Sequence, residues 1–269
     1  MKNKFDPYEF KHMEINGVPI FYKNLPWVRD CVHIRIIMRV GARHDPNGKE
    51  GLAHFFEHLP FDGCEGYPSF KHIDQFDRHT LIDTLNAYTS AEKTVYYCKV
   101  LPENLKEALR FLKRFIFRPL MESNEVERER GVITQEFWRK YHHKKAATLT
   151  KECCRDCYHD HSLGRADSAL GWAETITAIT CDDLVTFHPR YYIKEHLRLV
   201  LVGNMQSDEI KISTEEFFDE LPNGEALSQV KPTTTWPNPT KPGCTMSHKK
   251  DFATGEGAIP EHTDFTITR

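Results

Sequence analysis

The stretch Gly51–Gly63 reads GLAHFFEHLPFDG and decides how the rest of the chain is interpreted. A short helix is expected over residues 50–59, because the proline that follows limits how far a helix can continue. On this helix His54 and His58 are four positions apart, so both imidazoles project from one face and can bind one metal ion. Glu57 lies about 100° around the helix from His58, which puts it within reach of a water on that metal. This is the inverted form of the H-E-x-x-H zinc motif.

A short motif of this kind also arises by chance, so a helix with two solvated or core-packed histidines remains the alternative at this point. Catalytic zinc takes three protein ligands and keeps a fourth position for water. A helix expected over residues 124–142 offers carboxylates, and two of them, Glu129 and Glu136, are seven positions apart and share a face. For most acidic residues of that helix the alternative is a solvated face with arginine and lysine partners.

The HFFEH pattern, followed by ERERGVITQE at residues 127–136, resembles the pitrilysin family of zinc metallopeptidases. That family includes insulin-degrading enzyme and the β subunit of mitochondrial processing peptidase. The resemblance implies that His54, His58 and Glu136 bind one zinc ion per chain and that Glu129 is a supporting carboxylate near the metal. It also implies that Glu57 is the general base of catalysis, acting on a zinc-bound water.

Further segments follow the family's pattern in order, so the resemblance covers about residues 10–222. The segment LNAYT at residues 85–89 resembles the family's segment beside the active-site edge strand, where the substrate backbone is held, which implies that Asn86 and Ala87 bind the substrate. The implied fold is an α+β domain with a mixed, mainly antiparallel sheet packed against helices. Pro60, Asp62 and Cys64 depart from the family's usual residues and are expected to tune the loop after the motif.

Hydrophobic periodicity and turn signals predict the elements along the chain. We expect a hairpin within residues 9–23, with strands at 31–40, in the second half of 85–101 and at 197–203. We expect helices at 103–117, 124–142 and 174–187. The prolines and few apolar residues after about residue 228 indicate a linker or tail, so the predicted organisation is a catalytic domain at 1–228 and a Pro-rich tail at 229–269.

Composition excludes several classes of protein. A formal net charge of −3 argues against a nucleic-acid binder, and no apolar run is long enough for a transmembrane helix. The absence of a signal-peptide pattern favours a cytoplasmic location, in which the 8 cysteines are reduced. A lone CxxC at residues 154–157 is more typical of ordinary thiols than of a second metal site.

Members of the pitrilysin family generally have two homologous halves or two subunits, and this chain resembles the N-terminal catalytic half. The favoured hypothesis is therefore a zinc metalloendopeptidase that cleaves extended peptides and is completed by homodimerisation or by a separate non-catalytic partner subunit. The alternative is a binding or assembly subunit that keeps the fold without hydrolysis. A third possibility is a vestigial product that folds marginally.

Overall fold

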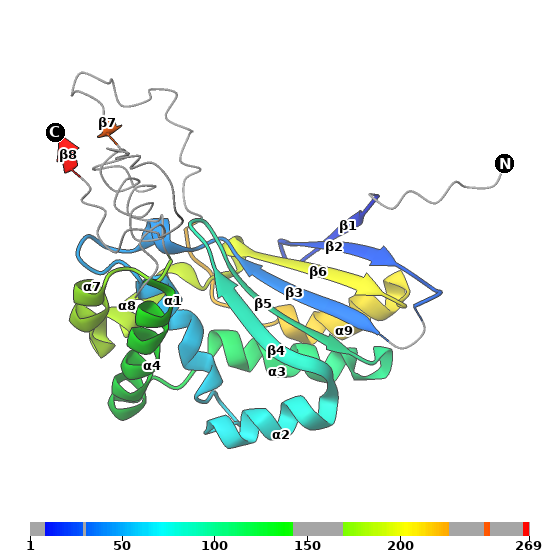
Figure 1. The fold of residues 1–269 in the computed structure, drawn as a ribbon. Helices are drawn as coiled ribbons and strands as arrows, with labels where there is room; N and C mark the ends of the chain where they lie inside the picture. Colours follow the sequence, from blue (N-terminus) through cyan, green and yellow to red (C-terminus); the bar gives the residue numbers. More distant parts are fainter. Residues whose placement is uncertain (1–8, 29–30, 142–168, 226–244, 248–265, 269) are drawn as a thin grey trace, which may run out of the picture.

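The structure is a computed structural model that describes residues 9–28, 31–141, 169–225, 245–247 and 266–268 (Figure 1). Its strands are β1 (Lys11–Ile15), β2 (Val18–Asn24), β3 (Val32–Met38), β4 (Leu81–Thr89), β5 (Thr94–Val100), β6 (Leu197–Gly203), β7 (Thr245–Ser247) and β8 (Thr266–Thr268). Its α-helices are α1 (Leu52–His58), α2 (Phe70–Thr80), α3 (Leu105–Phe117), α4 (Ser123–Tyr141), α7 (Ala173–Ala178), α8 (Cys181–Tyr191) and α9 (Ser207–Phe218). Four 3-10 helices connect them: η1 (Ala42–His44), η2 (Leu59–Phe61), η3 (Pro102–Asn104) and η4 (Lys194–His196).

Six strands form one mixed sheet in the order β1-β2-β6-β3-β5-β4. Only the β2–β6 pair of this sheet is parallel, and its other neighbouring strands are antiparallel. The predicted hairpin at 9–23 is β1–β2, closed by Asn16 and Gly17 with φ angles of 52° and 81°, as a tight type I′ turn requires. Helices cover the sheet, so the predicted α+β class with a mainly antiparallel sheet is confirmed.

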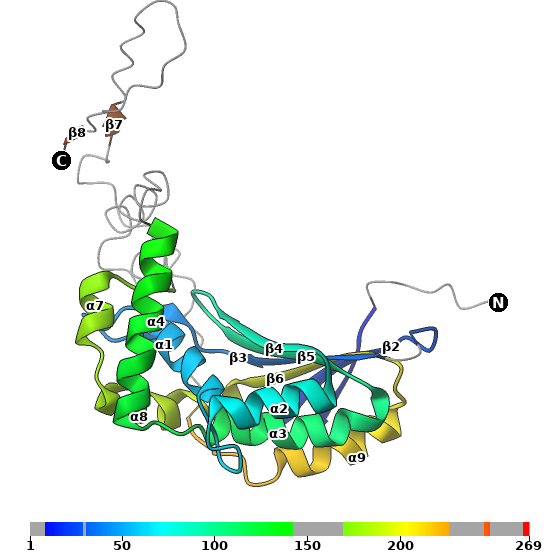
Figure 2. The same ribbon diagram turned by 60° about the horizontal axis from the view of Figure 1, so that its bottom comes forward.

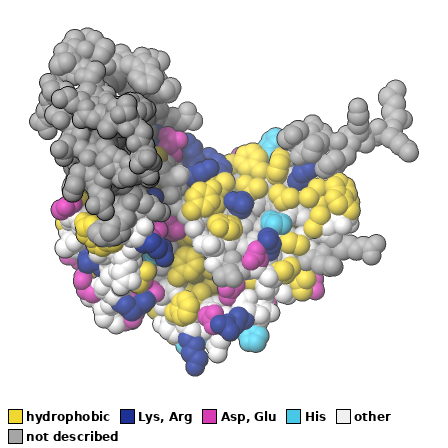
Figure 3. All heavy atoms as spheres, viewed as in Figure 1, with side chains coloured by type: hydrophobic (Ala, Val, Ile, Leu, Met, Phe, Trp, Pro, Cys, Tyr) yellow, Lys and Arg dark blue, Asp and Glu magenta, His cyan; other side chains and the backbone are white. Residues whose placement is uncertain are grey.

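The alternation of buried apolar residues with more exposed residues along the strands decides which face of the sheet is buried. In β3, Val32, Ile34, Ile36 and Met38 are fully buried, whereas the residues between them are more exposed. Helices α2, α3 and α9 lie along the buried face (Figure 2). The opposite face carries hydrophobic and charged side chains together (Figure 3). The core is therefore one layer between the sheet and these helices.

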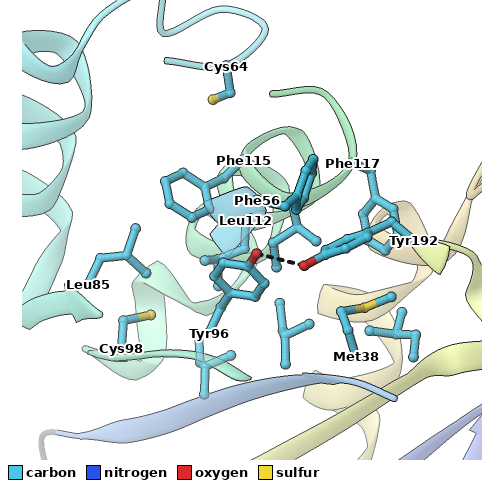
Figure 4. Close-up of a cluster of buried hydrophobic side chains, with 14 of the residues drawn as sticks. Met38, Phe56, Cys64, Leu85, Tyr96, Cys98, Leu112, Phe115, Phe117 and Tyr192 are labelled. Atoms are coloured by element: carbon cyan, nitrogen blue, oxygen red, sulfur yellow. Dashed lines mark hydrogen bonds between the residues drawn. The ribbon is translucent and has the colours of Figure 1, made fainter. Parts of the chain in front are cut away.

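Tyr96 of β5 and Tyr192, just after α8, meet inside this core (Figure 4). Both rings are fully buried and their hydroxyl oxygens lie 3.1 Å apart. Phe56 of α1 packs on Tyr192 with ring centroids 4.5 Å apart, and Phe115 of α3 packs edge-on against Tyr96. Helix α1 is thus anchored to the core by the side opposite its histidines.

Several predicted elements differ from the structure. The single helix expected at 174–187 is wrong: α7 and α8 replace it, because Ile179 takes an extended backbone with ψ of 132° and Thr180 caps a new helix. The strand expected in the second half of 85–101 is found as β5, whereas β4 begins at Leu81, before that range. Helices α2 and α9 were not predicted: α2 buries only Ile73 and Phe76 of an otherwise largely polar sequence, and α9 is only weakly amphipathic.

The bounds of the remaining predicted elements are found within about two residues, including the strand at 31–40, which ends at Met38. The CxxC at residues 154–157 lies outside the described residues, and so does most of the segment predicted as a tail. The division into a domain at 1–228 and a tail at 229–269 stays a prediction. Within the described ranges, no helix is long and apolar enough to cross a lipid bilayer.

Candidate metal centre

Helix α1 is seven residues long and carries three of the predicted site residues. His54 and Glu57 are buried and His58 is half-buried. His54 and His58 point their Nε2 atoms toward each other, 3.4 Å apart, with their rings edge-on. The i, i+4 spacing of the motif has therefore placed both imidazoles on one face.

The start of α1 is held by the buried carboxylate of Asp45. Asp45 accepts hydrogen bonds from the backbone N–H groups of Gly51 and Ala53, each at 2.8 Å. These are donors that the first turn of a helix cannot pair internally. Gly51 has a φ of 102°, and a Cβ there would lie 2.7 Å from the carbonyl oxygen of Leu170. A carboxylate nine residues before the first histidine of the zinc motif was the available signal.

Helix α4 brings the predicted third ligand to the pair. The Oε2 atom of Glu136 lies 3.7 Å from His54 Nε2 and 3.6 Å from His58 Nε2. Among the described residues, His54, His58 and Glu136 are the one group of three that could hold a metal ion. The interval between His58 and Glu136 is 78 positions, so the packing of α4 against α1 creates this triangle.

The triangle fits zinc. Ligand atoms about 2.0–2.1 Å from a tetrahedral zinc ion lie about 3.4 Å from one another, close to the separations of these three atoms. Two imidazoles and one carboxylate are also a donor set used by catalytic zinc, which keeps its fourth position open. The residues present therefore fit the ion that the resemblance implies.

Glu129 supports His58 from outside the triangle of His54, His58 and Glu136. Its Oε1 atom lies 2.7 Å from Nδ1 of His58, so the ring of His58 is held with Nε2 toward Glu136. Burial alone would lower the pKa of His58, but the hydrogen bond to Glu129 and the charges of the surrounding carboxylates raise it above its ordinary value. Within the described residues, Nδ1 of His54 is buried with no hydrogen-bond partner. Burial, followed by the charges of His58 and Lys140, lowers the pKa of His54 to about 3, which keeps its imidazole neutral as a metal ligand requires.

Glu57 lies beside the triangle without belonging to it. Burial raises the pKa of its carboxyl to about 7, and the negative charge of Glu136 adds to this shift. A hydrogen bond from Thr89 of β4 opposes it. A carboxyl with a pKa near neutrality can both accept and release a proton in that range.

A cleft of about 480 Å³ opens over these residues. The edge strand β4 forms one wall with Asn86 and Ala87, the two residues predicted to bind substrate, and the end of α4 forms another with Arg139 and Lys140. The N–H of Ala87 donates to Oδ1 of its neighbour Asn86 at 2.8 Å, so this donor is directed away from β5. Phe61 also lines the cleft, whereas Phe55 and Phe56 are fully buried.

The structure thus brings together every residue of the predicted site: His54, Glu57, His58, Asn86, Ala87, Glu129 and Glu136. Asp45 is the structural residue that the sequence reading missed.

Comparison with protein families gives two matches. The model described as "Insulinase (Peptidase family M16)" matches residues 27–167, slightly more than half of the chain. The model described as "Peptidase M16 inactive domain" matches residues 178–254.

Curated relatives agree with these matches. An "Uncharacterized zinc protease" of Rickettsia felis is 32% identical over 225 residues, which cover 84% of this chain and 52% of that protein. The "Mitochondrial-processing peptidase subunit beta" of Bos taurus is 32% identical over 200 residues, covering 71% of this chain and 37% of that subunit. The chain spans about half the length of the first of these relatives.

Solved structures share the fold. A protease from Helicobacter pylori superposes with a TM-score of 0.74 at 22% identity, over 82% of this chain and 52% of that one. The periplasmic protease PqqL from Escherichia coli superposes with a TM-score of 0.72 at 24% identity, over 86% of this chain and 25% of that one. The relatives are zinc proteases and peptidases by name, and the resemblance read from the sequence is confirmed: this chain belongs to the insulinase family of peptidases, family M16.

Proposed function

We propose that this chain is the catalytic half of a zinc-dependent metalloendopeptidase that hydrolyses peptide bonds in extended peptides. The observation that carries the proposal is the triangle of His54, His58 and Glu136, whose facing atoms are 3.4–3.7 Å apart. His54 Nε2, His58 Nε2 and a carboxylate oxygen of Glu136 would hold one zinc ion. Bound zinc supplies a Lewis acid that polarises a carbonyl and acidifies water.

Glu57 is the proposed general base. Its buried carboxyl, with a pKa of about 7, takes a proton from the attacking water and then delivers it to the leaving amine nitrogen. Its place next to the triangle, on the same helix as two ligands, supports this role. No other carboxyl is required for the proton transfer.

The edge strand β4 is the proposed substrate-binding element. Among the described residues β4 has no strand on its outer side, and a peptide in extended form can add to this edge with Asn86 and the backbone of Ala87 as partners. Such pairing uses main-chain groups and reads the extended shape of a peptide more than its sequence. Unfolded peptides are therefore the proposed substrate class.

A second half is proposed to complete the enzyme, either another copy of this chain or a separate partner subunit. Two observations support it: the chain spans about half the length of its first curated relative, and similar structures include one described as "the first half" of PqqL. Another relative is named as a subunit, the β subunit of the mitochondrial-processing peptidase. Light scattering of the purified chain, alone and with a candidate partner, tests this part of the proposal.

The central experiment compares zinc content and cleavage of a quenched fluorescent peptide in four variants and wild type. Glu57→Gln should keep zinc and lose hydrolysis, whereas His58→Ala and Glu136→Gln should lose zinc as well. Glu127→Gln is the matched control, because this glutamate is exposed on α4 and pairs only with Arg130 among the described residues; it should keep both properties. Hydrolysis by Glu57→Gln at the wild-type rate would contradict the mechanism, and zinc binding without hydrolysis in every preparation would favour the non-catalytic assembly subunit.

A further inference from the structure

A second layer of polar residues lies behind the metal site. Asp62 follows η2 and is four positions after His58, so both side chains face α4 from the continuous run of α1 and η2. Glu129 of α4 stands opposite them, with Oε1 against Nδ1 of His58 at 2.7 Å. Glu129 thus contacts His58, a proposed metal ligand, on one side and Arg128, which lies outside the triangle, on the other.

Arg128 joins these outer residues. Its guanidinium donates from NH2 to Oδ1 of Asp62 and lies 3.6 Å from Oε2 of Glu129. Its Nε donates to Oε2 of Glu125 at 2.8 Å, which fixes the guanidinium from the solvent side. The guanidinium of Arg128 therefore lies between the carboxyl groups of Asp62 and Glu129. The side chains of these two residues are each only 8% exposed.

Asp62 has one oxygen that the arginine does not satisfy. Within the described part of the chain, Oδ2 of Asp62 is buried and has no donor. Burial, followed by the negative charge of Glu129, raises the pKa of Asp62 to about 6 against the opposing charge of Arg128. Burial also acts to raise the pKa of Glu129, but the hydrogen bond and charge of His58 and the charge of Arg128 lower it below its ordinary value.

We propose that Asp62 and Arg128 are positioning residues, which hold Glu129 in the orientation that accepts the Nδ1–H of His58. With its proton kept on Nδ1, His58 presents the lone pair of Nε2 to the metal. Asp62, which follows His58 by four positions, thereby sets the tautomer of His58. The metal-binding consequence rests on the proposed function, whereas the orientation of the ring does not.

A purely structural role predicts something different. If the pair between Arg128 and Asp62 only fastened η2 to α4, its loss would lower stability and leave the His58 ring bonded to Glu129. The experiment must therefore observe the ring itself. The matched control is Asp74→Ala, which breaks the pair between Asp74 and the exposed Arg78 on α2, 3.0 Å long, on a helix that does not line the cleft.

The first measurement is the ring-nitrogen NMR spectrum of the full-length, metal-free chain with labelled histidine, at about pH 8, above the ordinary pKa of histidine. Wild type should show an exchange-protected Nδ1–H resonance for His58, assigned by its loss in Glu129→Ala. Asp62→Ala should lose this resonance or its protection. Asp62→Asn should keep it, because the amide can donate to Glu129 and accept from Arg128, and Asp74→Ala should keep it too.

The second measurement is the zinc dissociation constant, by competition with a chelator. Asp62→Ala should weaken zinc binding about tenfold, the lower end of the range for groups that orient metal-binding histidines. In the Glu129→Ala background the same change should alter the constant less than about twofold, because the residue it acts through is gone. Asp62→Asn should bind zinc as wild type does.

Clear results would overturn the inference. It is wrong if wild type lacks a protected His58 Nδ1–H, if Asp62→Ala keeps it with unchanged protection, or if Asp62→Asn fails as badly as Asp62→Ala in a folded chain. An equal effect of Asp62→Ala with and without Glu129 would also refute it. If wild type shows the ring signal and its dependence on Asp62 but binds no zinc, the proposed metallopeptidase fails and the positioning role stands.

Discussion

The hydroxyl groups of Tyr96 and Tyr192 lie 3.1 Å apart, although the two residues are separated by 96 positions in the chain. Tyr192 also packs against Phe56, the residue before the proposed general base, with ring centroids 4.5 Å apart. Burial raises the pKa of both phenols, and the nearby charge of Glu57 acts in the same direction. Both hydroxyls are therefore protonated, and they form a polar contact within an apolar core directly behind the metal-binding helix.

Tyr96→Phe should destabilise the chain by about 1–2 kcal/mol, because it leaves the buried hydroxyl of Tyr192 short of a partner. The double variant Tyr96→Phe/Tyr192→Phe should lose less than the sum of the single changes, since no hydroxyl is then left behind. Urea unfolding of the three variants measures this. Tyr88→Phe, on the exposed face of β4, is the control and should be neutral. Strict additivity of the two buried changes would contradict the expectation.

Gly51→Ala should destabilise the chain by more than about 2 kcal/mol, because a φ of 102° is strained for alanine and its Cβ would meet the Leu170 carbonyl at 2.7 Å. Gly131→Ala is the opposite case: it sits in α4 with nothing within 4 Å of an added Cβ. Alanine there should stabilise the chain by up to about 1 kcal/mol. Thermal melting of both variants tests the contrast, and a Gly51→Ala variant as stable as wild type would show that the start of α1 tolerates a different backbone.

Ala87→Pro should weaken peptide binding while the fold is kept, because the Ala87 N–H is directed away from β5 and proline removes only that donor. Successive N–H groups of a strand point to opposite edges, so Tyr88→Pro removes a donor directed toward β5 and should lower the melting temperature. The peptide affinity of both variants is measured in the Glu57→Gln background by anisotropy of a labelled extended peptide. Their melting temperatures are measured by thermal unfolding. Unchanged affinity in Ala87→Pro would argue against strand addition at β4.

Stability should fall with acid through His188, whose Nε2 donates to the Ile116 carbonyl at 3.1 Å and whose ring stacks on Phe56. Burial, followed by the charge of Arg118, lowers the pKa of His188 to about 4. The unfolded chain, in which this histidine titrates near 6.5, binds more protons between these values, so this contribution is complete above about pH 6.5 and is lost toward pH 4.

The expected loss from His188 is about 2 kcal/mol between pH 7 and pH 5. Urea unfolding at the two pH values, in wild type and His188→Gln, isolates this part, because the variant should lose less on acidification. His72→Gln, an exposed histidine of α2, should keep the wild-type pH dependence. An identical pH dependence in wild type and His188→Gln would show that His188 takes up a proton in the folded chain.

Local patterns were the reliable part of the sequence reading. The hairpin at Asn16 and Gly17, the strands β3 and β6 and the helices α3 and α4 all follow from turn residues and periodicity within one segment. The failures have two origins. The break between α7 and α8 depends on the extended backbone of Ile179, which no periodicity reveals. Helix α2 buries only Ile73 and Phe76, and two buried apolar side chains in a largely polar segment are too few to establish a period.

The sequence by itself determined that His54 and His58 share a face with Glu57 beside them, because the pitch of one helix fixes the positions of residues four apart. Only the tertiary structure decided that Glu136 reaches both imidazoles, that Arg128 lies between Asp62 and Glu129, and that β4 is the edge strand of the described sheet beside the cleft. These relationships join segments tens of residues apart. They arise when the apolar faces of α1, α4 and the sheet are buried together, a long-range condition that spacing along the chain does not contain.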